Sequence, residues 1–80
     1  EAGKSMIYPN PSADKITISW TSNIHGTDIA IYSVAGTCVA FSIPESNGTT
    51  MDISSLLPGH YMVQIEFTNG IKEFIPLIKQ

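Results

Sequence analysis

The chain has 80 residues, 42% of them hydrophobic and 14% charged, with a formal net charge of −3. This length fits one domain; the apolar content is too high for a disordered segment, and the apolar runs are too short for a membrane span. With 4 basic residues and 1 cysteine, the sequence offers neither the clustered basic face that nucleic acid requires nor an internal disulfide.

The first quarter of the chain contains two apolar runs separated by a proline-rich turn. Met6-Ile7-Tyr8 ends at Pro9-Asn10-Pro11, where two prolines exclude a helix and force the chain out of any sheet. Residues 15–20 then alternate between apolar and polar side chains, which predicts a strand with one face on a core. We expect Trp20 in that core rather than exposed as a sugar-stacking platform, because it shares the parity of the two isoleucines in the strand.

The middle of the chain predicts three further short strands joined by turns. Residues 28–32 alternate with their isoleucines inward, and Gly36 turns the chain into residues 37–43, whose large apolar side chains share one face. Pro44 ends that strand, and residues 49–53 form the next one.

The segment from Asp52 to Phe67 organises the rest of the fold. Residues 61–67 alternate with Tyr61 and the other odd-numbered residues facing a core. The preceding Pro-Gly dipeptide predicts a turn in which Gly59 has a positive φ. A tyrosine directly after such a corner resembles the tyrosine corner of immunoglobulin-like domains, whose hydroxyl bonds back to the chain. Asp52 precedes the corner, where its carboxylate can accept backbone N–H bonds from the turn.

The last two strands meet at Asn69-Gly70, which predicts a hairpin with a two-residue type I′ turn. Counting outward from that turn places Phe74 and Ile78 on the core side. Pro76 then falls at a position that makes no ladder bond to the partner strand, which suits an edge strand.

The same register turns three apolar side chains of the hairpin away from the core, those of Met62, Ile75 and Leu77. An outward apolar cluster often marks an interaction site, and methionine suits a surface that accepts varied partners. Partner binding at these residues is therefore one interpretation of the cluster. The alternative, that a loop or the N-terminal segment covers the cluster, stays open.

About seven short strands without a helical period predict an all-β immunoglobulin-like sandwich of antiparallel strands with Greek-key connections. No pattern indicates a catalytic residue, a metal centre or a cofactor. A metal requires three or four converging ligands, and His25, His60 and Cys38 are scattered along the chain. Cys38 also has no base in a recognisable pairing with it, so we expect it to be passive.

Several segments, taken in order, resemble the type A C-terminal sorting domain of proteins that Bacteroidetes export through the type IX secretion system. The first is Tyr8-Pro9-Asn10-Pro11, the second is the strand and glycine turn ending at Gly36, and the last is an apolar strand followed by Lys79. Between them lies an Asp-x-Ser-x-Leu-x-x-Gly-x-Tyr signature, matched by Asp52, Ser54, Leu56, Gly59 and Tyr61. The resemblance covers nearly the whole chain. Because the secretion signal of this family is concentrated in the final strand and its basic end, the resemblance favours partner binding at Met62, Ile75, Leu77, Ile78 and Lys79, with Ile78 holding the strand from the core side.

This resemblance implies a non-catalytic module at residues 6–80, with residues 1–5 as the end of a linker from an upstream cargo domain. The implied partners are the outer-membrane type IX translocon and a sortase-like cysteine peptidase, which removes such domains and can attach the cargo to surface lipopolysaccharide. The protein would pass through the periplasm to the outer membrane, the cell surface or the medium. The alternative is a β-sandwich accessory domain that binds carbohydrate or acts as a spacer in a secreted enzyme or adhesin.

Overall fold

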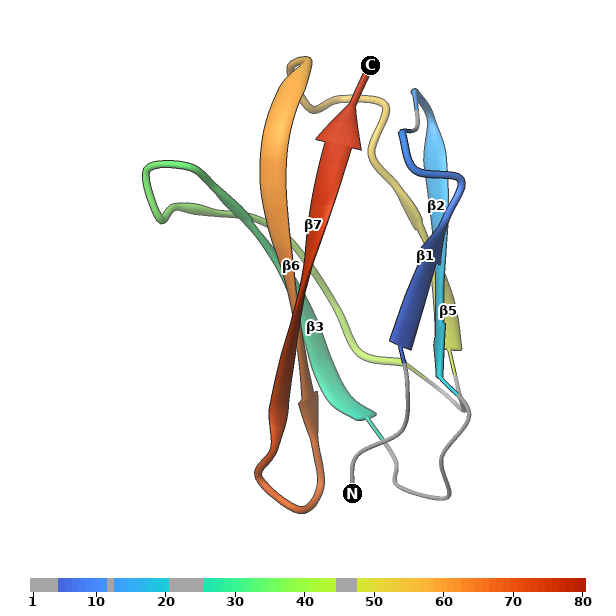
Figure 1. Ribbon diagram of the computed structural model, residues 1–80, viewed down its shortest axis with the longest axis vertical. Helices are drawn as coiled ribbons and strands as arrows, with labels where there is room; N and C mark the ends of the chain where they lie inside the picture. Colours follow the sequence, from blue (N-terminus) through green and yellow to red (C-terminus); the bar gives the residue numbers. More distant parts are fainter. Residues whose placement is uncertain (1–4, 12, 21–25, 45–47) are drawn as a thin grey trace.

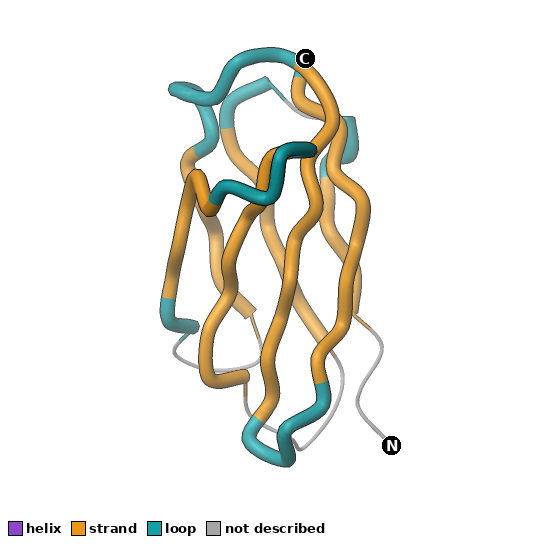
Figure 2. The backbone as a smooth tube through the Cα atoms, turned by 90° about the vertical axis from the view of Figure 1, so that its left-hand side faces the viewer, coloured by secondary structure: helices purple, strands orange, loops and turns teal. Residues whose placement is uncertain are grey.

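Seven antiparallel strands form two sheets that pack face to face in the computed structural model, which describes residues 5–11, 13–20, 26–44 and 48–80 (Figure 1). The strands are β1 (Ser5–Tyr8), β2 (Lys15–Trp20), β3 (Gly26–Ser33), β4 (Cys38–Ser42), β5 (Gly48–Asp52), β6 (Gly59–Phe67) and β7 (Lys72–Lys79). One sheet has the order β1-β2-β5 and the other, which faces the viewer in Figure 2, the order β4-β3-β6-β7. The predicted all-β sandwich is confirmed.

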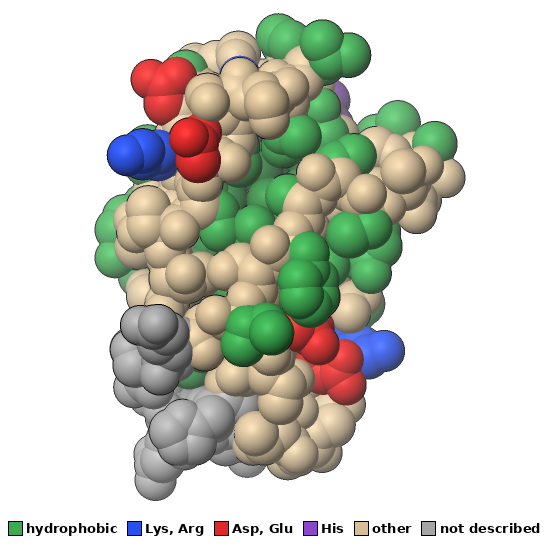
Figure 3. All heavy atoms as spheres, turned by 180° about the vertical axis from the view of Figure 1, so that it is seen from behind, with side chains coloured by type: hydrophobic (Ala, Val, Ile, Leu, Met, Phe, Trp, Pro, Cys, Tyr) green, Lys and Arg blue, Asp and Glu red, His purple; other side chains and the backbone are tan. Residues whose placement is uncertain are grey.

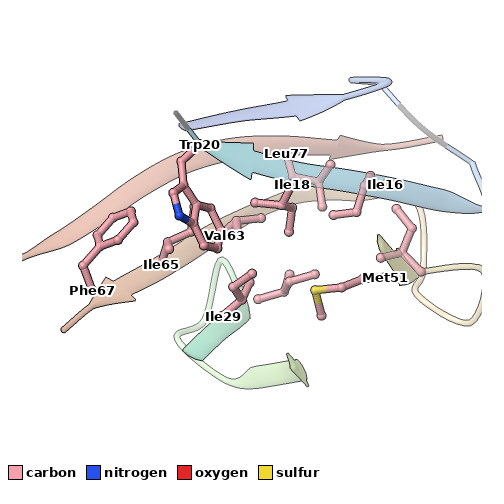
Figure 4. Packing of buried hydrophobic residues seen from close by; sticks show 11 residues of the cluster. Ile16, Ile18, Trp20, Ile29, Met51, Val63, Ile65, Phe67 and Leu77 are labelled. Atoms are coloured by element: carbon pink, nitrogen blue, oxygen red, sulfur yellow. The ribbon is translucent and has the colours of Figure 1, made fainter. Parts of the chain in front are cut away.

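The core lies between the sheets and is built from the inward residues of the alternating strands (Figure 4). Trp20 is 2% exposed and meets Phe67 edge to face, with ring centroids 5.5 Å apart, so its predicted core position is confirmed. Each fully buried aliphatic or aromatic side chain contributes about 1.5–3 kcal/mol to folding. The largest of these side chains are Ile16, Ile18, Ile29, Ile31, Ile53, Val63, Ile65, Phe67 and Leu77.

The β6–β7 hairpin has a three-residue loop, so the predicted two-residue turn is wrong. Phe67 N–H donates to the Ile71 carbonyl at 2.9 Å, and Gly70 N–H donates to the Phe67 carbonyl at 2.9 Å. Gly70 has a φ of +86°, whereas Asn69 does not have the positive φ that a type I′ turn requires of both central residues. The Asn69 side chain instead accepts the Ile71 N–H at 3.1 Å and stabilises the longer loop.

This one-residue shift exchanges the two faces of β7 relative to the prediction. Leu77, expected outward, is fully buried opposite Tyr61, and Ile75, also expected outward, is half-buried against the core. Phe74 and Ile78, expected inward, are 57% and 41% exposed. The predicted register and the core roles of Phe74 and Ile78 are therefore wrong.

The β3–β4 hairpin is built in the same way as β6–β7. Ser33 N–H donates to the Thr37 carbonyl at 2.8 Å, and Gly36 N–H donates to the Ser33 carbonyl at 2.9 Å, with a φ of +88° at the glycine. Beyond the turn, Val39 and Phe41 share the exposed face of β4. The sequence pattern correctly grouped these large apolar side chains but did not say that they face away from the core.

Candidate docking site at the C-terminal end of the sandwich

The Pro9-Asn10-Pro11 turn lies against the outer edge of β7. The Asn10 amide Nδ2 donates to the Pro76 carbonyl at 2.9 Å, and Ile78 N–H donates to Asn10 Oδ1 at 3.0 Å. Phe67 and Ile71 form a hydrogen-bonded pair beside the hairpin loop, and bonded and non-bonded pairs alternate along the ladder from there. The backbone groups of Pro76 and Ile78 therefore point away from β6, as predicted for Pro76. The side chain of Asn10 thus bonds the edge groups that a neighbouring strand would otherwise take.

A second contact joins the same two regions farther along β7. The Ser5 hydroxyl of β1 donates to the carboxylate of Glu73, which faces inward from β7. Lys79, at the other end of the strand, is only 7% exposed, and its Nζ donates to the Gln80 carbonyl at 2.9 Å. Together with Asn10, the Ser5–Glu73 contact connects the two sheets along the side where β1 faces β7.

The corner before β6 begins with a turn that Asp52 stabilises. Asp52 Oδ1 accepts the Ser54 N–H at 2.9 Å and the Ser54 hydroxyl at 2.7 Å. The bond from the Ser54 hydroxyl, and after it the bond from the Ser54 N–H, lowers the pKa of Asp52 below its ordinary value because both stabilise the ionised carboxylate. The role in the turn that the sequence predicted for Asp52 is confirmed.

The corner ends with the arrangement expected for an immunoglobulin-like domain. Gly59 has a φ of +148°, and the Tyr61 hydroxyl donates to the Leu57 carbonyl at 2.6 Å. The Tyr61 ring and the neighbouring Leu56 side chain are half-buried against the core. The predicted positive φ and the predicted tyrosine corner are both confirmed.

The motif segments meet at one end of the sandwich, close to the C-terminal end of β7 (Figure 1). Ile53 N–H donates to the Asp14 carbonyl at 2.7 Å, which joins the corner to the loop after β1. Gly59 at the start of β6 pairs with Lys79 in the ladder of β7. Gly36 is the exception among the motif residues, because it lies in the turn of the β3–β4 hairpin.

Of the five residues expected to bind a partner, two point outward. Met62 and Ile78 are each 41% exposed, whereas Ile75 is half-buried and Leu77 and Lys79 are 0% and 7% exposed. The outward placement of Ile75 and Leu77 and the inward placement of Ile78 are thus wrong, because the longer loop shifts the register by one residue.

A surface pocket of about 420 Å³ lies beside the two outward residues, between the β3–β4 hairpin and the outer face of β6 and β7. Val34, at the tip of that hairpin, is 87% exposed and forms one wall. No Lys, Asp or Glu side chain is among the lining residues, so the site suits an apolar side chain. This terminal pocket is lined by Ser33, Val34, His60, Tyr61, Met62 and Pro76.

Residues 6–79 match the family model of the secretion system C-terminal sorting domain. The chain belongs to this family. The resemblance stated from the sequence motifs is thereby confirmed, and the sorting domain carries a signal for type IX secretion, which implies a contact with the secretion system, an attached cargo and export to the cell surface or beyond. No curated protein matches the chain.

The remaining candidate residues of the sorting domain do not converge. Cys38 is exposed, and its Sγ contacts the Ala40 carbonyl at 3.4 Å, while His60 lies on the outer face and His25 falls outside the described residues. Within the described ranges, no group of three or more His, Cys, Asp and Glu side chains could hold a metal ion. The same part of the chain contains no helix long and apolar enough to cross a membrane.

Sequence reasoning missed the contact that positions the C-terminal strand of the sorting domain. The sequence placed Asn10 in a turn, whereas its side-chain amide also bonds the carbonyl of Pro76, 66 residues farther along the chain. Sequence reasoning also missed the pairing of Ser5 with Glu73. The only local signal was the pair of prolines around Asn10, which keeps this segment out of a regular strand and leaves its side chain available for another contact.

Proposed function

We propose that this domain is a non-catalytic signal that directs an attached cargo protein across the outer membrane through the type IX system. Residues 6–80 form the signal, and residues 1–5 are the end of the linker from the cargo domain. The translocon recognises the domain from the periplasmic side. A sortase-like cysteine peptidase then removes it, and the cargo remains anchored at the cell surface or is released. The family match over residues 6–79 carries this proposal.

The translocon contact is the terminal pocket together with the outward side chains of Met62 and Ile78. Both side chains are 41% exposed and flank Pro76, which Asn10 holds in place from the edge. Partially exposed apolar side chains around a shallow pocket are typical of protein interaction sites. Leu77 supports this surface from the core side.

The test fuses residues 1–80 to the C-terminus of a secreted reporter in a host that has the type IX system. We expect the reporter at the cell surface or in the medium, and export of the Met62→Ser/Ile78→Ser variant should fall at least tenfold. Phe74→Ser is the matched control, because Phe74 is 57% exposed on the same strand but pairs with Gln64, whereas Ile78 pairs with His60, which lines the terminal pocket. Circular dichroism of each purified domain checks that it folds.

Retention of the parent reporter inside the cell would contradict the proposed function. Normal export of the folded double variant would instead show that the translocon contacts another surface, and a variant lacking residues 79–80 then asks whether the end of β7 is required.

A further inference from the structure

The sandwich has two flanks where the edges of its sheets face each other, and they differ. The bridged flank, between β1 and β7, is closed by the contacts of Asn10 and Ser5 with β7. The open flank lies between β5, the edge of one sheet, and β4, the edge of the other. In the part of the chain that the structure describes, no side-chain hydrogen bond joins β4 to β5.

A groove of about 320 Å³ runs along the open flank. We call it the edge groove. Ala40 and Phe41 of β4 line one side, Thr50 and Met51 of β5 line the other, and Leu56 lies at the corner end. Figure 3 shows this side of the molecule, with hydrophobic side chains visible in the hollow between the two sheets. Met51 belongs to the hydrophobic core, and Ala40 and Leu56 pack against it, so the floor of the groove is the core itself.

The edge of β5 differs from the edges of β4 and β7, because it has neither a proline, a lysine nor a bulge. Unpaired strand edges are usually blunted by proline, lysine or a bulge. The edge of β7 has Pro76 and the Asn10 contact, and β4 has a bulge opposite Tyr32. In contrast, Gly48–Asp52 contains neither proline nor lysine, and its pairing with β2 is regular. No strand of the described residues pairs with its second side, so the backbone N–H and C=O groups there are available to water or another polypeptide.

No strand of the described residues lies beside β5 on its outer side. Constant-type immunoglobulin sheets hold four strands in the order A-B-E-D. Here β4 pairs with β3 in the other sheet instead, so the order is β1-β2-β5 and β5 is the outer strand of its sheet. A strand beside β5 would lie along the edge groove, between the two sheets.

We propose that the edge groove binds an extended strand of a protein partner, which pairs with β5 as a fourth strand of that sheet. The backbone of this strand bonds the free edge of β5, and an apolar side chain opposite Met51 fills the groove. A basic residue at the corner end faces Asp52, the one charged residue among the described lining residues. This inference does not depend on the proposed function, because it concerns binding by the purified domain.

The sequence of β2, which already pairs with β5, shows which residues can stand opposite those of β5 in a ladder. In β2, Lys15 pairs with Asp52, Ile16 with Met51 and Thr17 with Thr50. The probe is therefore a capped synthetic peptide that copies residues 14–20, titrated into the isotope-labelled 80-residue chain and followed by NMR. We expect saturable shifts of the backbone amides of residues 49–52. A peptide N-methylated at its threonine, the residue opposite Thr50, should bind at least tenfold more weakly, because alternation from the Ile53–Asp14 bond directs the backbone groups of Thr50 towards the free edge.

Two phenylalanines provide matched variants of the protein. Phe41 is 60% exposed on the wall of the edge groove, and Phe74 is 57% exposed at the opposite edge of the same sheet. Phe41→Glu should weaken peptide binding at least tenfold, and Phe74→Glu should change it less than twofold. Phe41→Ser replaces the glutamate variant if that variant does not fold.

The proposal is overturned if saturating peptide leaves residues 49–52 unshifted, if the shifts fall on β7, or if both phenylalanine variants bind alike. Equal binding of the N-methylated peptide would show an apolar contact without strand pairing, which also overturns it. Shifts at residues 49–52 that depend on protein concentration without peptide would make the occupant a second copy rather than a partner strand. Binding without export in the reporter assay would separate this inference from the proposed function.

Discussion

The bridged flank and the open flank end their sheets in opposite ways. On the bridged flank, the side chain of Asn10 bonds the edge of β7 at Pro76 and Ile78, and Ser5 of β1 bonds Glu73. On the open flank, β5 ends its sheet without such a contact from the described residues, and apolar side chains line the edge groove. The difference shows that the Pro-Asn-Pro segment fixes the position of the C-terminal strand, while the other flank leaves a strand edge available.

The largest expected effect is on the free energy of unfolding, and it tests which face of β7, the edge strand of the bridged flank, packs against the core. Leu77 is fully buried and Ile78 is 41% exposed, so Leu77→Ala should cost about 2–5 kcal/mol of unfolding free energy and Ile78→Ala less than about 1 kcal/mol. Denaturant unfolding of the two variants measures both values. A larger loss for Ile78→Ala would restore the register of a two-residue turn and contradict the hairpin described above.

The next effect tests the contact that distinguishes the bridged flank. Asn10→Ala removes two hydrogen bonds to β7 and should cost about 1–2 kcal/mol. Asn10→Asp keeps the acceptor for Ile78 N–H but loses the donor to the Pro76 carbonyl, so it should recover no more than part of that loss. Thermal unfolding of the three proteins provides the comparison. If the alanine variant melts with the parent, Asn10 does not stabilise the edge.

The smallest effect lies at the corner end of the open flank. The pKa of Asp52 is lowered by its bonds with Ser54, so the folded carboxylate releases its proton more readily than the unfolded one. Its stabilisation is therefore complete above about pH 4, the ordinary pKa, and is lost as the pH falls through the lower folded value. Parent and Asp52→Asn should differ by a constant amount from pH 5 to 7 and converge towards pH 2. A difference that does not change with pH would mean that the charge of Asp52 plays no part.

Alternation in the sequence was sufficient to predict the strands and the core side of most of them. Residues 15–20 and 61–67 contain one apolar set each, and only one orientation buries it. β7 differs, because Phe74-Ile75 and Leu77-Ile78 place apolar residues on both faces. Either register buries enough apolar surface there, so the length of the loop determines the register. Asn-Gly does not specify that length, because it occurs in both two-residue and three-residue loops.

The docking residues were predicted less well for the same reason. Met62 is outward as expected, because β6 has one clear apolar face, whereas the β7 residues follow a register that the sequence left ambiguous. The corner was predictable because its interactions are local: Asp52 with Ser54, and Tyr61 with Leu57. The Asn10 contact joins residues 66 positions apart, and no local pattern specifies it.

Hydrogen exchange at the Ile78 amide tests the central claim, that the Asn10 side chain takes the place of a strand at the edge of β7. Ile78 N–H points away from β6 and donates to Asn10 Oδ1 at 3.0 Å. NMR-detected exchange of the 80-residue chain should therefore show Ile78 protected, and Asn10→Ala should remove most of that protection at Ile78 while the Val63 and Ile65 amides inside the sheet stay protected. An Ile78 amide that exchanges equally fast in the parent and in Asn10→Ala would contradict the claim.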